Sequence, residues 1–372
     1  MNSYPAEIFA TWPTVCAVGD EYQIMVPVLK ETLMWVEAGG RMYYDDANGI
    51  LRSATSVHRM TVPMRVLDGA EAYTIHYREV YERLPYRSRV GDEETVTYSF
   101  RPVRPDAECI RIYHIADTHS MIELPVRAGS FWGDKLDFLV MNGDIPNDCG
   151  SIENIASTLQ VCGAITKGGV AMVFSRGNHD LRGVLAEKYA ENTPSRNGKT
   201  YYTFRLGPIW GIVMDCGEDK VDDHVEYAHT ICCHDFRLRE TEYLRQVAAD
   251  PEHEYAAPGV KCRMVIVHHP FTQTREPPFD IELELFGEWC RILKESIKPD
   301  MMLCGHIHDI YVTRPGEAKD HKGQPCPVVV GSKIIHPDFY AGCALEWTPG
   351  KMKILFTDQD HNIIGCDNLT FS

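Results

Sequence analysis

The chain has 372 residues and a mass of 42.2 kDa, and its 44% hydrophobic and 24% charged residues argue against long disorder, collagen-like repeats and coiled coil. This length favours two domains. The 37 Lys and Arg against 53 Asp and Glu leave a net charge of −16, which repels phosphate backbones, so we expect no specific nucleic-acid binding.

The N-terminal segment lacks the pattern of a secretory signal, since no Lys or Arg precedes Lys30 and prolines interrupt its apolar residues. No apolar run approaches the ~20 residues that a membrane-spanning helix needs. We therefore expect a cytoplasmic protein that does not contact membranes. None of the 13 cysteines forms a C-x-x-C pair, so most are expected to be reduced core residues.

The first hundred residues predict β structure. Short apolar or aromatic runs alternate with turn residues, at 22–29, 32–36, 41–44, 58–64, 72–80 and 94–100. Strands at this spacing predict a small all-β sandwich of the immunoglobulin or fibronectin type over residues 1–103. The segment 101–108 has two prolines and mixed charge and predicts a linker.

From residue 107 to residue 372 the pattern predicts an α/β domain, because buried strands alternate with helices. Interior strands are expected at 110–115, 137–141, 170–174, 262–267 and 301–304, a hairpin at 201–215, and further strands within 328–371. Helices are expected near 152–165, 181–191, 236–249 and 281–297.

Each of the five interior strands runs into Asp, Asn or His. The residues concerned are Asp117 and His119, Asp144, Asn178 with His179 and Asp180, His268, and His306 with His308. Sites in open α/β sheets lie beyond the carboxyl ends of strands, so these side chains are expected to converge. Carboxylate, amide and imidazole ligands suit a pair of divalent or trivalent ions such as Mn, Fe or Zn. Neighbouring glycines (Gly143, Gly177 and Gly305) permit close backbone approach.

In combination, the segments D-x-H, G-D-x-x-N, G-N-H-D, H-H-P and G-H-x-H resemble the calcineurin-like metallophosphoesterase superfamily over residues 107–372. The resemblance implies an α/β (α+β) fold, a double β-sandwich flanked by helices, with a two-metal site. It implies ligands for the first metal from Asp117, His119 and His308, and for the second from Asn178, His268 and His306. Asp144 is implied to bridge the two.

The resemblance also implies how the reaction proceeds. Two metals sharing Asp144 and a water would lower the pKa of that water and supply hydroxide for in-line attack on phosphorus. His179 is implied to be the general acid or a stabiliser of phosphate charge, with Asp180 holding its imidazole.

Subgroups of the superfamily match in part. The N-terminal β-domain resembles that of purple acid phosphatases, on VHRMTVP (57–63), AYTIHY (72–77) and TYSFRP (97–102). Their tyrosine ligand is replaced here by Asn147, so no coloured Fe(III)–tyrosinate site is expected. The segment from Arg176 resembles the R-G-N-H motif of Ser/Thr phosphoprotein phosphatases, but their arginine after the bridging aspartate is absent, so membership of that group is not expected.

The predicted function is a phosphoester hydrolase, mono- or diesterase, for a small or medium phosphorylated substrate; the alternative is a non-catalytic binding scaffold with the same fold. For Arg176 two roles are equally expected, binding a phosphate oxygen or forming an ion pair with a carboxylate. For Arg182 the ion pair is favoured. Residues 215–224 predict a solvated acidic loop. The proline-bearing segment 271–280 predicts a loop that overhangs the metals.

Overall fold

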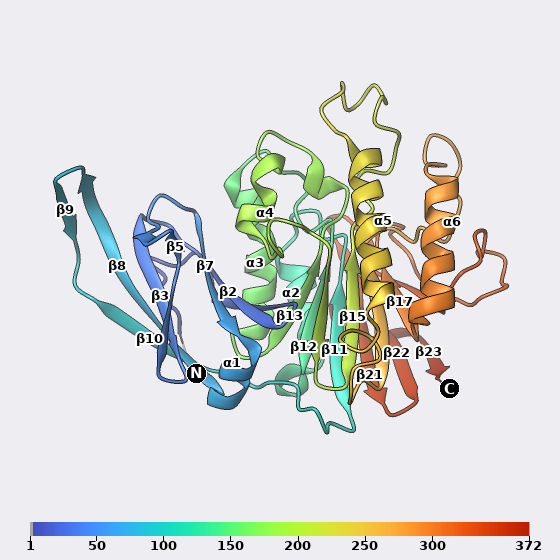
Figure 1. The fold of residues 1–372 in the computed structure, drawn as a ribbon, viewed down its shortest axis with the longest axis horizontal. Helices are drawn as coiled ribbons and strands as arrows, with labels where there is room; N and C mark the ends of the chain where they lie inside the picture. The colour runs from blue at the N-terminus through green and yellow to red at the C-terminus, as the bar shows by residue number, and fades with distance from the viewer. Residues whose placement is uncertain (1–2, 372) are drawn as a thin grey trace.

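The computed structural model describes residues 3–371, in which two large β-sheets pack against each other between layers of helices (Figure 1). The larger, ten-stranded sheet has the spatial order β23 (Ile363–Thr370), β22 (Lys351–Asp358), β21 (Phe339–Thr348), β11 (Ile110–Ile115), β12 (Phe138–Asn142), β13 (Ala171–Ser175), β1 (Thr14–Val18), β2 (Glu21–Pro27) and β7 (Val57–Pro63), with β20 (Lys333–Ile335) paired to β21. The six-stranded sheet has the order β14 (Tyr202–Leu206), β15 (Ile209–Met214), β16 (Cys262–Val267), β17 (Met301–Cys304), β19 (Val328–Gly331) and β18 (Ile310–Thr313).

The central strands are buried on both faces, as strand β12 illustrates. Phe138 and Val140 belong to the core between the two sheets, whereas Leu139 and Met141 pack under the helices on the other side. The helices on this side are α2 (Glu123–Gly129) and α3 (Ile152–Thr166). Those covering the six-stranded sheet are α5 (Cys233–Ala249) and α6 (Leu283–Ile292), which continues into η4 (Leu293–Ile297). The predicted double β-sandwich flanked by helices is therefore confirmed.

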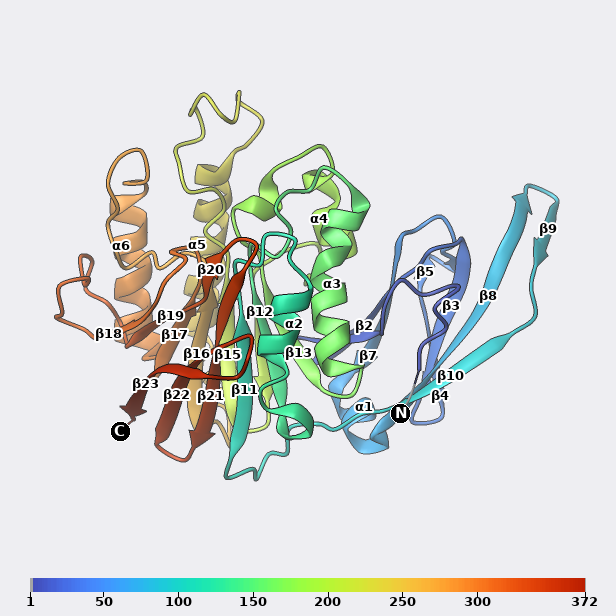
Figure 2. The same ribbon diagram turned by 180° about the vertical axis from the view of Figure 1, so that it is seen from behind.

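The N-terminal region adds a third layer of strands. Its five-stranded sheet comprises β10 (Glu94–Ser99), β8 (Ala72–Leu84), β3 (Thr32–Ala38) and β4 (Arg41–Tyr44), with β9 (Arg87–Val90) paired to β8. The region also contains β5 (Asp46–Ala47), β6 (Ile50–Leu51) and the short helix α1 (Met64–Ala70). Both views show this sheet beside the end of the larger one, with the β8–β9 hairpin projecting from the body (Figures 1 and 2).

Strands of this region also continue the larger sheet. Strand β1 pairs in parallel with β13, Val15 opposite Ala171, and β2 and β7 follow it. One hydrophobic core accordingly contains Ile75 of the N-terminal sheet together with Ile112. The division of the chain between residues 103 and 107 stays a prediction, and backbone hydrogen bonds join the two parts.

Most predicted elements lie within a residue or two of the observed ones, but the helix expected at 181–191 is wrong. That segment forms three short pieces, η2 (His179–Leu181), η3 (Ala186–Lys188) and α4 (Tyr189–Asn192). Gly183 breaks it, because it has φ of 108° and a Cβ there would lie 2.6 Å from the backbone carbonyl carbon of Cys149. Strand β1, helix α2 and η1 (Gly133–Lys135) were not predicted; each is too short to show periodicity.

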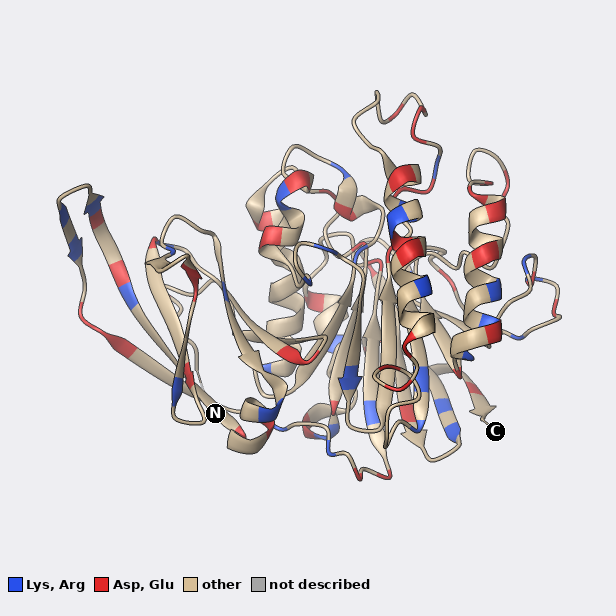
Figure 3. Ribbon diagram, in the orientation of Figure 1, with Lys and Arg blue, Asp and Glu red and all other residues tan. Residues whose placement is uncertain are grey.

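Helices α5 and α6 carry charged residues of both signs along their lengths (Figure 3). The cysteines are free and most are buried, as predicted. Among residues 3–371, no helix is both long and apolar enough to cross a membrane.

Candidate metal centre

The seven predicted ligand residues lie where strands of the two sheets end. Strands β11, β12 and β13 are parallel neighbours in the larger sheet, and β16 and β17 are parallel neighbours in the smaller one. The residues that follow these strands are Asp117 and His119, Asp144, Asn178, His268, and His306 with His308. The sheets therefore bring together residues that are up to 191 positions apart in the chain.

Three groups of possible ligand atoms form at this edge, and two of them match the predicted ligand sets. In the first, one atom each from Asp117, His119 and His308 lie within 4.8 Å of one another; in the second, the same holds for Asp144, His268 and His306. Asn178 joins the second group, since its Oδ1 lies 3.0 Å from His306 Nδ1. Asp144 also forms a group with His119 and His179, and so lies between the two predicted metal positions. His269, the neighbour of His268, belongs to no such group among the described residues.

The backbone at these positions is unusual. Five of the seven residues have positive φ, between 44° and 71°: Asp117, His119, Asp144, His306 and His308. A left-handed backbone costs a residue with a Cβ roughly 1–2 kcal/mol, and it persists only where the surrounding structure imposes it. Here backbone hydrogen bonds hold the turns, including Asp117 N to Gly143 O and His119 N to Asp144 O, each 3.1 Å. Local backbone energy does not favour these turns. They are explained by the need to point the five side chains into the cluster.

Glycines allow the turns to approach one another. A Cβ on Gly177 would lie 2.3 Å from Asp144 Oδ1, and one on Gly305 would lie 2.7 Å from Asp117 Oδ2. A Cβ on Gly143 would lie 2.6 Å from the nitrogen of Gly177. The expected close approach at these three glycines is confirmed, since no larger residue fits without moving a predicted ligand or its turn.

Two buried carboxylates lie at the centre of the cluster. Asp117 and Asp144 are at most 1% exposed. Burial raises the pKa of Asp117, but His268 and His308 outweigh it, so that the pKa lies below its ordinary value. The pKa of Asp144 is well below its ordinary value, because His268 and His179 likewise outweigh burial. Both carboxylates therefore carry negative charge that a bound cation would offset.

His268 is oriented towards these carboxylates. Its Nε2 lies 3.1 Å from Asp144 Oδ2 and 3.6 Å from Asp117 Oδ1. Burial lowers the pKa of His268, but the two carboxylates raise it, to about 10. Its Nδ1 donates to the carbonyl oxygen of Asn142 at 2.7 Å, as ring nitrogens of metal-binding histidines commonly do. His268 therefore presents Nε2 to the cluster. With the oxygen and imidazole donors around it, the cluster fits metal ions of the Mn, Fe or Zn type.

Ser332 and Asn142 support the predicted ligands but were not singled out in the sequence. The hydroxyl of Ser332, after strand β19, donates to Asp117 Oδ2. The side chain of Asn142 donates to Leu303 O at 3.1 Å and so joins the two sheets beneath the site. Ser332 follows the apolar run VVVG and so also stands at a strand end, but the search for Asp, Asn and His does not include serine. His114 is fully buried, and its Nε2 lies 3.0 Å from Asn142 Nδ2, so it is a core histidine and not part of the ligand cluster.

The prediction that Asp180 holds the imidazole of His179 is wrong. His179 Nδ1 donates instead to the carbonyl oxygen of Asn147 at 2.7 Å, and its Nε2 lies 3.1 Å from Arg182 Nη1. Asp180 points inwards, where its Oδ2 accepts from the backbone N–H of Gly177 at 2.7 Å. Burial and the nearby Asp144 raise the pKa of Asp180 to about 8. Asp180 therefore fixes the turn that carries Asn178, and Asn147 orients His179.

The acidic segment 215–224 was predicted to be solvated, and this prediction is wrong for its first half. Asp215 and Glu218 are at most 1% exposed because each neutralises an arginine. Arg176 Nε donates to Asp215 at 2.7 Å, so the ion pair left open for Arg176 is present. Its role in binding phosphate stays a prediction. Arg182 forms a two-pronged pair with Glu218, at 2.8 and 2.9 Å, as favoured from the sequence.

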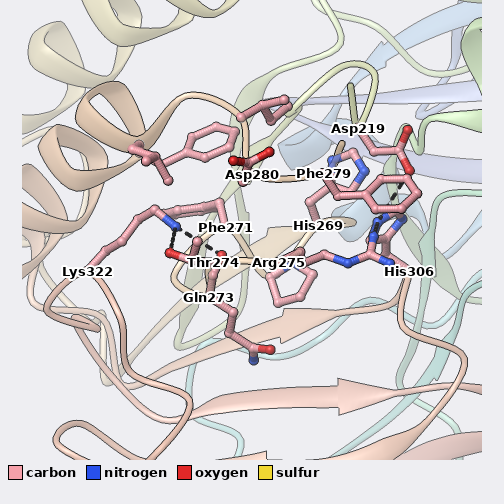
Figure 4. A pocket seen from close by; sticks show the side chains of 14 residues that line it. Asp219, His269, Phe271, Gln273, Thr274, Arg275, Phe279, Asp280, His306 and Lys322 are labelled. Atoms are coloured by element: carbon pink, nitrogen blue, oxygen red, sulfur yellow. Dashed lines mark hydrogen bonds and ion pairs between the residues drawn. The ribbon is translucent and has the colours of Figure 1, made fainter. Parts of the chain in front are cut away.

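The loop after His268 lines a pocket beside the cluster (Figure 4). Phe271, Phe279 and Phe286 form apolar walls, and His306 of the second ligand group forms part of its lining. Residues 271–280 therefore help to shape a pocket next to the predicted ligands, and their position over bound metals stays a prediction.

A double β-sandwich with carboxylates, an amide and imidazoles at its strand ends defines a class of metal-dependent phosphoesterase folds. The sequence profile of the calcineurin-like phosphoesterase family matches residues 110–309, more than half of the chain, and the chain belongs to this family. A comparison with curated protein sequences finds no match.

Solved structures share the fold beyond that range. The purple acid phosphatase PPD1 from seeds of yellow lupin (Lupinus luteus) superposes with a TM-score of 0.61 at 12% identity, over 97% of this chain and 74% of the other. The structure of PhoD superposes with a TM-score of 0.58 at 10% identity, over 100% of this chain and 90% of the other. Both matches include the N-terminal strands, so the predicted likeness of that region to purple acid phosphatases is confirmed at the level of fold.

Proposed function

We propose that this protein is a dinuclear-metal-dependent phosphoester hydrolase that acts on small or medium phosphorylated substrates. The observation that supports the proposal most strongly is the position of Asp144. Its carboxylate lies within one group with His119 and His179 and within another with His268 and His306. A carboxylate that bridges two metal ions must satisfy this condition, and a structural ion pair need not.

The proposed site combines seven ligands in two sets. Asp117, His119 and His308 would hold one metal ion, Asn178, His268 and His306 would hold the other, and Asp144 would be shared. Two ions of this kind, when bound, would activate a shared water and neutralise phosphate oxygens. The chain contributes two buried carboxylates, which offset cationic charge, and ring nitrogens whose other N–H is already engaged, as at His268.

His179 is proposed to assist the leaving group. Its Nδ1 is committed to the carbonyl of Asn147, so Nε2 is the nitrogen that can transfer a proton. Arg182 Nη1 lies at that nitrogen and must turn away from it before Nε2 can carry a proton. Protonation of the departing oxygen by a placed imidazole contributes typically ~10²–10⁴-fold to rate.

The test is a substrate panel. Purified protein, stripped of metal and then loaded with Mn, Fe or Zn, is assayed against phosphomonoesters and phosphodiesters, with the stripped protein as the matched control. Hydrolysis of at least one ester class that requires added metal is expected. A protein that binds two ions but hydrolyses no ester would contradict the proposal and favour the non-catalytic scaffold.

A further inference from the structure

Arg275 occupies an unusual position between the pocket and the ligand cluster. It lies on the loop between β16 and α6, and its Nη1 is 2.5 Å from Nε2 of His306 (Figure 4). The ring of Phe279 packs on the guanidinium, with 4.5 Å from Cζ to the ring centroid. Among residues 3–371, no carboxylate lies within ion-pairing distance of Arg275, whereas Arg176 and Arg182 both have one. In a chain of net charge −16, this cation at the edge of the site is left without an anionic partner.

The contact with His306 fixes the protons on that ring. A guanidinium only donates hydrogen bonds, so Nε2 of His306 must accept. The proton of the neutral ring is then on Nδ1, which lies 3.0 Å from Asn178 Oδ1, an acceptor. Both hydrogen bonds of the ring are then satisfied. Nδ1 of His306, however, carries a proton and donates to Asn178, so it has no free lone pair for a metal.

The arrangement is incompatible with a ligand role for His306. Asn178 is the other predicted ligand at this position, so the nitrogen that His306 offers to a metal is Nδ1. An imidazole that binds a metal through Nδ1 carries its proton on Nε2. That N–H would then face the N–H groups of Arg275, and two donors cannot form a hydrogen bond. Loading of the site therefore requires Arg275 to leave.

Asp219 is placed to take over the contact. Its Oδ2 faces His306 Nε2 at 3.9 Å, whereas its Oδ1 is held by Lys220 and Tyr227, each at 3.3 Å. Carboxylates commonly accept the outer N–H of metal-binding histidines in this manner. His306 would thus exchange a cationic donor for an anionic acceptor.

We propose that Arg275 is a substrate-binding residue that contacts the phosphoryl oxygens once it is released from His306. The inference rests on the proposed function. The released guanidinium stays tethered to the edge of the site by its loop, and its planar fork matches two phosphate oxygens. Lysine cannot reproduce that geometry.

The experiment measures ligand binding rather than turnover. Inorganic phosphate is titrated calorimetrically into the zinc-loaded protein, for the wild type, Arg275→Gln, Arg275→Lys and Arg245→Gln. Arg245 is an exposed arginine of α5 that pairs with Glu288, so its variant controls for the loss of one positive charge. Zinc affinity is measured for each protein by competition with a chelator, and melting temperature reports folding.

Arg275→Gln is expected to weaken phosphate binding by roughly 10–100-fold, with Arg275→Lys in between and Arg245→Gln within twofold of the wild type. Zinc affinity of Arg275→Gln should equal or exceed that of the wild type, because no donor competes at His306. Equal phosphate affinity in Arg275→Gln and Arg245→Gln would overturn the proposal, as would a tenfold loss of zinc affinity on removing Arg275. Failure of the proposed function is distinct: the wild type would then bind no zinc, or would bind zinc and phosphate but hydrolyse no ester.

Discussion

Gly177→Ala tests whether the metal centre depends on the close approach of two turns. A Cβ at this position would lie 2.3 Å from Asp144 Oδ1 and 2.5 Å from the backbone nitrogen of Asp144, where ordinary contact begins at 3.4 Å. Asp144 must therefore retreat by about 1 Å, and a displacement of that size can cost ~10²-fold in rate. We also expect overpacking to cost ~1–3 kcal/mol of stability.

Gly287→Ala is the matched control for this substitution. Gly287 lies within α6, and a Cβ there meets nothing within 4 Å. The control should gain about 0.4–1 kcal/mol of stability from reduced backbone freedom and keep full activity. Metal content per chain, kcat/KM on an aryl phosphoester and melting temperature are measured for both variants. Wild-type metal content and rate in Gly177→Ala would refute the reasoning, because the shared carboxylate would then tolerate the displacement.

Three further variants test two other residues of the site and one buried carboxyl of α5. His179→Asn should retain metal but lose ~10²–10⁴-fold in kcat on an alkyl phosphoester and less on a nitrophenyl ester, and an equal loss on both would reject proton donation. Ser332→Ala removes the hydroxyl bound to Asp117 and should weaken metal affinity by ~10–100-fold in a chelator competition; an unchanged affinity would show that Ser332 only fills space. Glu240 lies on α5, where its Oε1 accepts from the backbone N–H of Asp215. Burial, and then Asp215, raise the pKa of Glu240 well above its ordinary 4.5, so the folded chain holds the carboxyl proton more tightly than the unfolded chain does. Stability is then lost as the pH rises above about 4.5, by up to about 1.4 kcal/mol per pH unit. In urea titrations, Glu240→Gln should therefore raise the free energy of unfolding more at pH 8 than at pH 5. An equal gain at the two pH values would count against this account of Glu240.

The positions of the predicted ligands could be read from the sequence because strand ends mark them. Buried apolar runs such as 110–115 and 262–267 are unmistakable, and parallel strands place whatever follows them at one edge. Asp117 and His268 therefore come together although about 150 residues separate them. Strand β1 was missed because its five residues show no pattern until β13 provides an edge to pair with.

The contacts of the individual polar groups could not be predicted in the same way. Asn147 orients His179 through a backbone carbonyl, and every residue has one, so the sequence carries no signal for it. The acidic segment 215–224 was predicted to be solvated because it contains many charged residues and no partner for them nearby in the sequence. Its partners, Arg176 and Arg182, lie more than thirty residues away and remove it from solvent. Pairing of this kind depends on which loops the sheets bring together.

The central claim is that Asp144 is shared by two metal ions. Elemental analysis of metal-reconstituted protein, for the wild type and Asp144→Asn, tests it most directly, with circular dichroism to confirm that both chains are folded. An amide cannot offset the charge of two cations, so the variant should lose one or both ions, whereas the wild type should hold two per chain. Fewer than one ion per wild-type chain, or two ions retained by Asp144→Asn, would contradict the account.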